Sequence, residues 1–293
     1  MPSPATPRRT RWATAVVAAL TLAGLLNGVP PVGAVSATAG PATAGPAGSQ
    51  GPVVALRGRS SLVLSHPEHA AAAAGLIHEV DDAVTAVTAA WGTDWAQSVV
   101  VVIPGSQQEM SALIGDGLVL DRIAAVATAA SSQAGQRVVV NPDNLDELGP
   151  EVRRVVIRHE IAHLAARGVT SPDTPAWLVE GFADYVGYLD SGIPIRSAAG
   201  DLARAVQRDD MPGDLPDAAS FHGSSPRLGQ AYQEGWLACL LIAERVGPAG
   251  LLRFYRVAAA GPLALEAALE DVLGTTYRQF VEDWRAYVVQ QLG

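Results

Sequence analysis

The sequence is poor in residues that crosslink a fold or bind nucleic acid. It has one cysteine, Cys239, which excludes an intramolecular disulfide framework and any C-x-x-C zinc or redox site. Lysine is absent, all 20 basic residues are arginines without a cluster, and the net charge is −9. Binding to a nucleic-acid backbone needs clustered positive charge that replaces the released counterions. We therefore expect no nucleic-acid partner.

Aromatic and charged residues are also few, at 5% and 17%, whereas hydrophobic residues make up 49% of the 293 residues. This composition excludes disorder for most of the chain and is typical of a globular protein. The length is sufficient for one large domain or two small ones, with a sizeable core.

The N-terminus has the layout of a secretory signal. Three arginines precede an apolar stretch, residues 12–26, and small residues follow with a candidate cleavage site after Ala37. We expect a signal peptide at 1–37, a Pro/Gly/Ala-rich linker at 38–52 and a folded domain at 53–293. An uncleaved signal anchor is the alternative, but 15 apolar residues are fewer than the roughly 20 needed to span a bilayer. No membrane span is expected after cleavage, so the protein is predicted to be secreted.

The first part of the domain, to about residue 148, alternates strand and helix signals. Two S-x-x-E sequences, starting at Ser65 and Ser106, predict capped helix starts. The predicted elements are a strand or hairpin at 53–64, a helix to about 90, a strand at 98–103, a helix after 106, and a hairpin formed by 122–130 and 137–140.

The second part, 149–293, has helical periodicity throughout, with a further cap at Thr276. A 20-residue connection at 209–228 holds three prolines and two glycines and is predicted to form one wall of a cleft. The order of elements predicts an α+β fold, with a small mixed β-sheet in the N-terminal half and a mostly helical C-terminal half. The predicted helices are 149–167, 175–190, 197–208, 229–246, 248–259, 263–273 and 276–291.

A metal-binding motif lies on the first of these helices. His159-Glu160-Ile161-Ala162-His163 fits H-E-x-x-H, and four residues advance a helix by about 400°, which places the two imidazoles one turn apart on one face. Neutral imidazoles suit zinc, and Glu160 lies about 100° round the helix, beside the open position of the metal. Chance occurrence of the motif on an exported helical protein is the weakest alternative.

The next predicted helix carries two acids that complete this pattern. Glu180 lies 17 residues after His163, far enough for an antiparallel return, and would give the two-His, one-carboxylate set of catalytic zinc sites. Asp184, one turn further on, is placed to accept the second ring N–H of a ligating histidine. A solvated surface charge is the alternative for either acid, and the spacing to the first motif disfavours it.

The chain resembles the gluzincin branch of zinc metallopeptidases. The sequences HEIAH and WLVEGFADY carry this resemblance, and QAYQEGW with Gly247 is similar to the "peptidase MA-like" family. The resemblance implies a zincin-like fold, zinc held by His159, His163 and Glu180, and Glu160 as the catalytic base, with Asp184 orienting a ligating histidine. The metzincin pattern is excluded because Ala166 and Val169 stand where it needs Gly and His.

A peptidase of this type needs a second donor for the negative charge that develops on the scissile carbonyl oxygen. Tyr232 is the first choice, because it starts a helix after the 209–228 connection and the resemblance places a tyrosine near the cleft. His222, within that connection, is the second choice. Simple packing remains the alternative for Tyr232, and solvation for His222.

We therefore expect an exported zinc-dependent peptidase that acts on a peptide or protein substrate. The alternative is a non-catalytic binding module that keeps the same fold, which the intact Glu160 disfavours. The sequence G-x-M-x-N, found in many aminopeptidases of the branch that the chain resembles, is absent, which favours endopeptidase action. The oligomeric state is left open. Trp177 and Tyr185 are expected to pack the second metal helix, Cys239 to be an inert core thiol, and Arg158 to face solvent.

Overall fold

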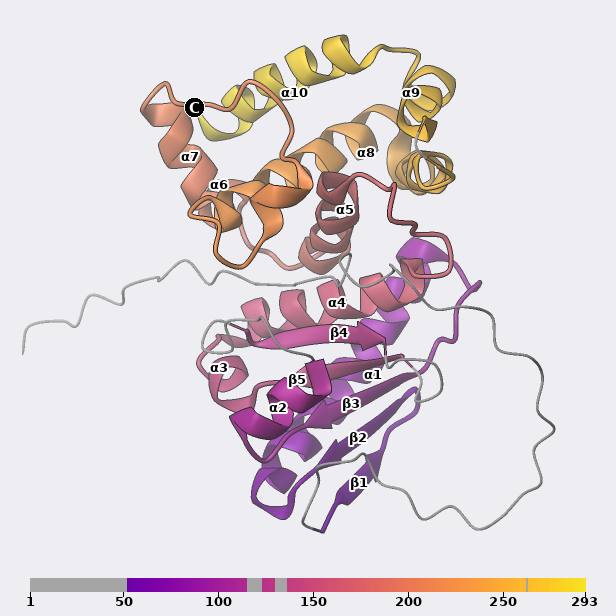
Figure 1. Ribbon diagram of the computed structural model, residues 1–293, viewed down its shortest axis with the longest axis vertical. Coiled ribbons are helices and arrows are strands. Elements are labelled where there is room, and N and C mark those ends of the chain that lie inside the picture. The colour runs from indigo at the N-terminus through magenta and orange to yellow at the C-terminus, as the bar shows by residue number, and fades with distance from the viewer. Residues whose placement is uncertain (1–51, 115–122, 130–135, 262) are drawn as a thin grey trace, which may run out of the picture.

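The computed structural model describes residues 52–114, 123–129, 136–261 and 263–293. Figure 1 shows a lower part that holds the β-sheet and an upper part made of helices, with α4 (Pro150–Ala166) beside the sheet and facing the upper part. The predicted α+β class is confirmed. The expected signal peptide at 1–37, and all of the expected linker except its last residue, lie outside the described residues.

The sheet is small and mixed. Its strand order is β1-β2-β3-β5-β4, in which the two inner pairs are parallel and the two outer pairs are antiparallel. The predicted hairpin of β4 and β5 is confirmed, and the segment 53–64, predicted as a strand or hairpin, forms the antiparallel pair of β1 and β2. Strand β4 lies at one edge of the sheet. The strands are β1 (Val54–Arg57), β2 (Ser61–Ser65), β3 (Val99–Ile103), β4 (Ala125–Ala129) and β5 (Gln136–Val140).

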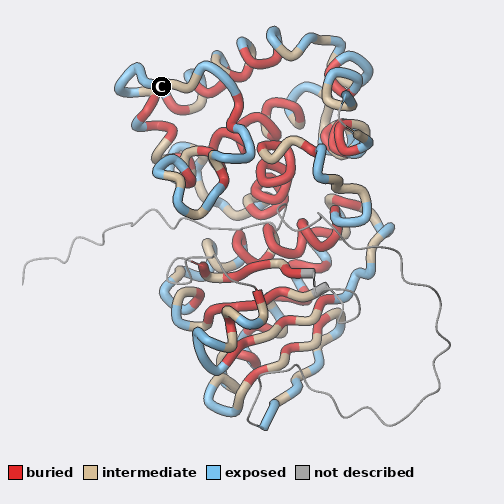
Figure 2. The backbone as a smooth tube through the Cα atoms, viewed as in Figure 1, coloured by how far each residue is buried: buried red, intermediate tan, exposed pale blue. Residues whose placement is uncertain are grey.

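The core lies between the sheet and two long helices. Alternate residues of β2 and β3 are buried, as expected for strands with one covered face, and their side chains include Val63 and Val101. Helices α1 (Ala70–Trp91) and α4 pack on the sheet, α1 over β2 and α4 over β4 and β5. Figure 2 shows that burial continues from the strands through α4 into α5 (Ala176–Tyr188) and α8 (Leu228–Ala258) of the upper part.

Helices make up the rest of the described fold. The predicted helices are found, and Pro142–Asp146 is a short helix that the sequence analysis missed. The α-helices are α1 (Ala70–Trp91), α2 (Gln107–Ile114), α3 (Pro142–Asp146), α4 (Pro150–Ala166), α5 (Ala176–Tyr188), α6 (Ile195–Ala198), α7 (Gly200–Gln207), α8 (Leu228–Ala258), α9 (Ala264–Ala268) and α10 (Tyr277–Leu292). Three shorter turns are η1 (Pro67–His69), η3 (Ala218–Phe221) and the π-turn η4 (Leu269–Leu273).

Two of the three predicted caps form. Ser106 Oγ accepts from Glu109 N at 3.1 Å, and Thr276 Oγ1 accepts from Gln279 N at 3.3 Å. The prediction that Ser65 caps a helix is wrong. Pairing with β3 keeps this residue extended as the last residue of β2, and η1 begins two residues later at a proline.

Helix α8 spans two predicted helices, 229–246 and 248–259. They meet at a kink where Gly247 has φ 76°, and Pro248 follows. By length and composition alone, α8 is long and apolar enough to cross a membrane. One face of α8 is buried against α5, and 44% of its most apolar 18-residue window is buried inside the protein.

Helix α5 packs between α4 and α8 at very close range. A Cβ atom on Gly181 would lie 2.2 Å from the carbonyl oxygen of Gly235 in α8, and one on Gly187 would lie 2.9 Å from the carbonyl oxygen of Val155 in α4. Glycine is therefore required at both contacts, because any side chain would push the helices apart. These contacts set the position of Glu180, which neighbours Gly181 in α5.

Candidate metal centre

Helix α4 presents its two motif histidines to one point. His159 and His163 lie one turn apart, and their Nε2 atoms are 3.0 Å from each other. Neighbouring positions of this helix, such as Val156 and Ile161, are fully buried in the apolar core. The packing of those residues fixes the rotation of α4, and so aims both imidazoles away from the sheet toward α5.

Helix α5 brings the third ligand-type side chain to the same point. Glu180 Oε2 lies 3.4 Å from His159 Nε2 and 3.3 Å from His163 Nε2. All three side chains are buried, with exposed fractions of 0%, 9% and 2% for His159, His163 and Glu180. Their ligand atoms lie within 4.8 Å of one another, the arrangement of a metal-binding group.

The donor set and its spacing fit zinc. Tetrahedral ligands at Zn–N and Zn–O distances of about 2.0–2.1 Å lie about 3.3–3.4 Å from each other. The three donor separations in this site are 3.0, 3.3 and 3.4 Å. Two imidazole nitrogens and one carboxylate oxygen are also the ligands that catalytic zinc sites use. This group could therefore hold one zinc ion.

Asp184 contacts the far side of the first imidazole. Its Oδ1 atom lies 2.8 Å from His159 Nδ1, and its side chain is buried. Asp184 can accept a hydrogen bond from Nδ1–H, and in the neutral imidazole this leaves the lone pair on Nε2, the atom directed at Glu180 and His163. Glu180 and Asp184 lie four residues apart on one face of α5. Glu180 therefore lies beside the Nε2 atoms of both histidines, whereas Asp184 contacts Nδ1 of His159.

These buried groups shift one another's proton affinity. Burial alone would lower the pKa of His159, but the Asp184 and Glu180 carboxylates raise it to about 10. Burial alone would raise the pKa of Glu180, but the charges and hydrogen bonds of the two histidines lower it to about 2. Burial raises the pKa of Asp184 despite its contact with His159. The site therefore concentrates negative charge around two imidazoles.

Glu160 connects the site to the sheet edge. Its Oε2 atom accepts a hydrogen bond from the backbone N–H of Ala127 in β4, at 2.6 Å. Its Oε1 atom is buried and has no hydrogen-bond partner among the described residues. Burial raises the pKa of Glu160, against the two histidine charges, which lower it. One oxygen is thus held and the other is left for a proton or a water molecule.

Tyr232 closes the site from the first turns of α8. Its ring centroid is 6.0 Å from that of His159, and its side chain is buried. Burial, reinforced by the charges of Glu180, Asp184 and Glu160, raises the pKa of Tyr232 well above its ordinary value. The phenol therefore keeps its proton and can act as a hydrogen-bond donor.

The second predicted donor lies elsewhere. His222 is exposed and follows η3 in the 209–228 connection. That connection contains η3, and Phe221 at the end of η3 is buried against Tyr232 with ring centroids 5.3 Å apart. Buried apolar contact with α8 orders this segment.

Four other residues show how the helices are held. Trp177 and Tyr185 are buried in the packing around α5, as expected, with Trp177 stacked on Phe280 at 6.1 Å. Cys239 is fully buried, and burial raises its pKa well above the ordinary value. The solvent-facing position expected for Arg158 is wrong, because it donates at 2.6 Å to the Leu189 carbonyl just after α5, where helix carbonyls lack partners.

Two contacts of the site were not predicted. Ala127 acts through its backbone, so its residue type gives no signal, although a predicted strand close before the metal helix could have suggested a contact. Phe221 lies in a segment rich in turn residues, and only its apolar character within a polar run distinguished it. Both contacts depend on tertiary structure that sequence spacing does not determine.

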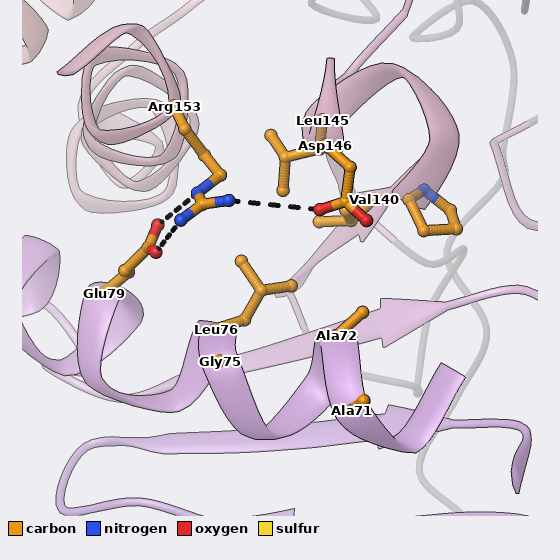
Figure 3. Close-up of a pocket in the computed structure, with 10 residues that line it drawn as sticks. Ala71, Ala72, Gly75, Leu76, Glu79, Val140, Leu145, Asp146 and Arg153 are labelled. Atoms are coloured by element: carbon orange, nitrogen blue, oxygen red, sulfur yellow. Dashed lines mark hydrogen bonds and ion pairs between the residues drawn. The ribbon is translucent and has the colours of Figure 1, made fainter. Parts of the chain in front are cut away.

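A separate hollow of about 210 Å³ lies between α1, α3 and the start of α4 (Figure 3). Small residues such as Ala72 and Gly75 line its α1 side. Arg153 reaches into it, donates from Nε to Glu79 at 2.8 Å, and lies 3.9 Å from Asp146. Arg153 is already paired with carboxylates. Its ion pair with Glu79 connects α4 to α1 across this hollow.

Comparison with known proteins gives a weak structural match. No family profile and no curated protein sequence matches the chain. A mutant two-domain M1 zinc metallopeptidase, solved with L-arginine bound, has 14% sequence identity and a TM-score of 0.43. The match covers 81% of this chain and 51% of the metallopeptidase, so the chain spans about half the length of that protein.

Proposed function

We propose that this protein is an exported zinc-dependent peptidase of the gluzincin type. The observation that carries the proposal is the convergence of His159 Nε2, His163 Nε2 and Glu180 Oε2 beside the buried Glu160 carboxylate. A site built only to bind zinc needs its ligands but not an adjacent general base. The three ligand-type side chains would hold the ion, which would activate a water molecule and polarise the scissile carbonyl.

Glu160 is proposed as the general base. Oε1 accepts a proton from the attacking water as the new C–O bond forms, and the same proton passes to the amide nitrogen as the C–N bond breaks. The Ala127 N–H holds Oε2 at 2.6 Å and so keeps Oε1 in one orientation through both transfers. Oε1 is buried and has no other hydrogen-bond partner among the described residues, so it is the oxygen available to take the proton.

Tyr232 is proposed to stabilise the oxyanion. Its phenol keeps its proton at neutral pH and lies beside His159, so it can donate to the carbonyl oxygen as negative charge develops there. A donor fixed in place by packing needs no reorganisation during the reaction. Tyr232 is buried, unlike His222, which makes it the better donor of the two predicted residues.

The edge of the sheet favours an extended peptide as substrate. The Ala127 N–H points away from β5 toward Glu160, whereas the Ala124 carbonyl accepts from Asn141 at the end of β5. By strand alternation, the backbone groups of Ala125 and Ala129 also point away from β5. A peptide could therefore pair with β4 as an added strand, which would place its backbone next to Glu160.

The test is zinc stoichiometry together with cleavage of a peptide library. We expect about one zinc per chain in protein purified after export, an N-terminus at Thr38, and cleavage that stops with chelator and returns with zinc. Glu180→Ala should lose the metal, and Glu160→Gln should keep it without activity. Zinc binding with no cleavage of any library peptide would favour the binding-module alternative, and failure to bind zinc would refute the proposal.

The position of the cut distinguishes the two peptidase classes. Mass spectrometry of the library products shows whether single residues leave the N-terminus or internal bonds are cleaved. We propose endopeptidase action, and an N-acetylated library is the control, because acetylation blocks the amine that an aminopeptidase needs. Loss of all cleavage on acetylation would instead identify an aminopeptidase.

A further inference from the structure

The ring of Tyr232 is held by two other rings. One is the imidazole of His159, with centroids 6.0 Å apart and planes at 59°. The other is Phe221, whose ring meets Tyr232 edge to face, with centroids 5.3 Å apart and planes at 88°. We propose that Phe221 is a positioning residue that fixes the Tyr232 phenol for catalysis. The catalytic part of this inference rests on the proposed function of Tyr232.

The segment that carries Phe221 is itself anchored. Asp217 caps η3 by accepting from Ser220 N at 3.0 Å and Ser220 Oγ at 2.8 Å. Phe221, the last residue of η3, is 8% exposed. At the other end of the segment, Arg227 donates at 2.8 Å to Glu234, whose side chain is fully buried in α8. Phe221 therefore contacts Tyr232 from a segment that is anchored by hydrogen bonds at both ends.

A phenol donor must have one well-defined position. Two side-chain torsions place the hydroxyl of a tyrosine, and a donor has to lie close to the site of charge development to be effective. Edge-to-face aromatic contacts favour one ring orientation by about 2- to 12-fold in population. Replacing Phe221 with an aliphatic residue keeps the buried volume apolar but removes this preference, so Tyr232 would sample other orientations.

The first test needs no catalysis. A 3-fluorotyrosine placed at position 232 reports ring orientation by fluorine NMR in the zinc-loaded and zinc-free protein. We expect one narrow resonance with Phe221 present, a broadened or split resonance in Phe221→Leu, and a single resonance again in Phe221→Tyr, which restores a ring. Phe254→Leu, a buried phenylalanine that packs against Trp177, is the matched control and should leave the resonance narrow.

The second test is kinetic. Phe221→Leu should lower kcat about 2- to 12-fold with KM and zinc content unchanged, and Phe221→Tyr should restore kcat. In a Tyr232→Phe background, which lacks the hydroxyl, Phe221→Leu should have no further effect. Equal effects of Phe221→Leu in both backgrounds would overturn the proposal, because Phe221 would then act independently of that hydroxyl.

The two tests separate this inference from the proposed function. An unchanged fluorine resonance in folded Phe221→Leu refutes the positioning role, whether or not the protein cleaves peptides. A changed resonance in a protein without peptidase activity supports the positioning role and refutes the proposed function. If Phe221→Leu does not fold, Phe221→Met supplies the same comparison with a more adaptable side chain.

Discussion

The tightest helix contact in the described structure makes a quantitative prediction. Gly181 in α5 faces Gly235 in α8, and an alanine methyl at position 181 would lie 2.2 Å from the Gly235 carbonyl oxygen, 2.4 Å from its carbon and 3.0 Å from Cys239 Sγ. Backbone atoms cannot swing aside as a flexible side chain can. Gly181→Ala must therefore separate the two helices.

The size of the effect follows from two opposing terms. Ordinary contact begins at 3.4 Å, so relief of a 2.2 Å contact needs a movement of about 1 Å between helices that are packed along their length. Overpacking of this kind costs about 1–3 kcal/mol. Alanine regains up to about 1 kcal/mol in helix propensity. Because the closest clashing atoms belong to the backbone, the upper part of the overpacking range applies, about 2–3 kcal/mol, and subtracting about 1 kcal/mol leaves an expected net loss of about 1–2 kcal/mol in the free energy of unfolding.

The assay is urea unfolding of the chelator-treated protein, so that metal binding does not contribute. Gly75→Ala is the matched control, because this α1 glycine has nothing within 4 Å of its would-be Cβ and should be stabilised by about 0.5–1 kcal/mol. The same substitution is thus expected to act with opposite signs at the two positions. A Gly181→Ala variant as stable as the parent would refute the close contact of α5 and α8.

Three further substitutions test the site and its surroundings. Glu160→Gln should lower kcat by about 10²- to 10⁴-fold while zinc content stays constant, measured by elemental analysis beside steady-state kinetics. Asp184→Asn should weaken zinc binding by about 10- to 100-fold in chelator competition, because the hydrogen bond that fixes His159 changes. Burial raises the pKa of Glu234 from 4.5 to about 6, against the opposing charge of Arg227, so the folded state holds this proton more tightly than the unfolded state. Glu234 should therefore make the zinc-free protein less stable as pH rises from 4.5 to 6, and Glu234→Gln should make that fall smaller in urea titrations.

Much of the fold was predictable because local signals and tertiary packing agree. The β-branched run Val99–Ile103 forms a strand, the helical apolar spacing around His159 forms α4, and Thr276 caps α10. The helix cap predicted at Ser65 does not form, and the reason is physical. A capping sequence competes with strand pairing, and in this chain the parallel ladder with β3 extends through Ser65 itself. Local rules therefore held wherever no sheet neighbour competed for the backbone.

The residues of the candidate site also separate into those that local sequence signals predict and those that depend on tertiary contacts. Helical periodicity alone predicts that His159 and His163 share a face, and the spacing to α5 suggested Glu180 and Asp184, which the structure brings to the same point. Contacts from distant segments were beyond sequence reasoning. Ala127 contributes an N–H that every residue except proline carries, and Phe221 acts through a contact across a loop. Neither has a residue signature that spacing could reveal.

The charge balance of the site explains why it suits a dication. Three buried carboxylates, those of Glu160, Glu180 and Asp184, surround two imidazoles. Burying uncompensated negative charge is costly, and the protein groups alone meet that cost by holding protons, which is why the pKa values of Glu160, Asp184 and His159 are all raised. A doubly charged ion among the same side chains replaces those protons with a stronger partner. Metal binding should therefore release protons, and the excess of negative charge favours a dication over a neutral ligand.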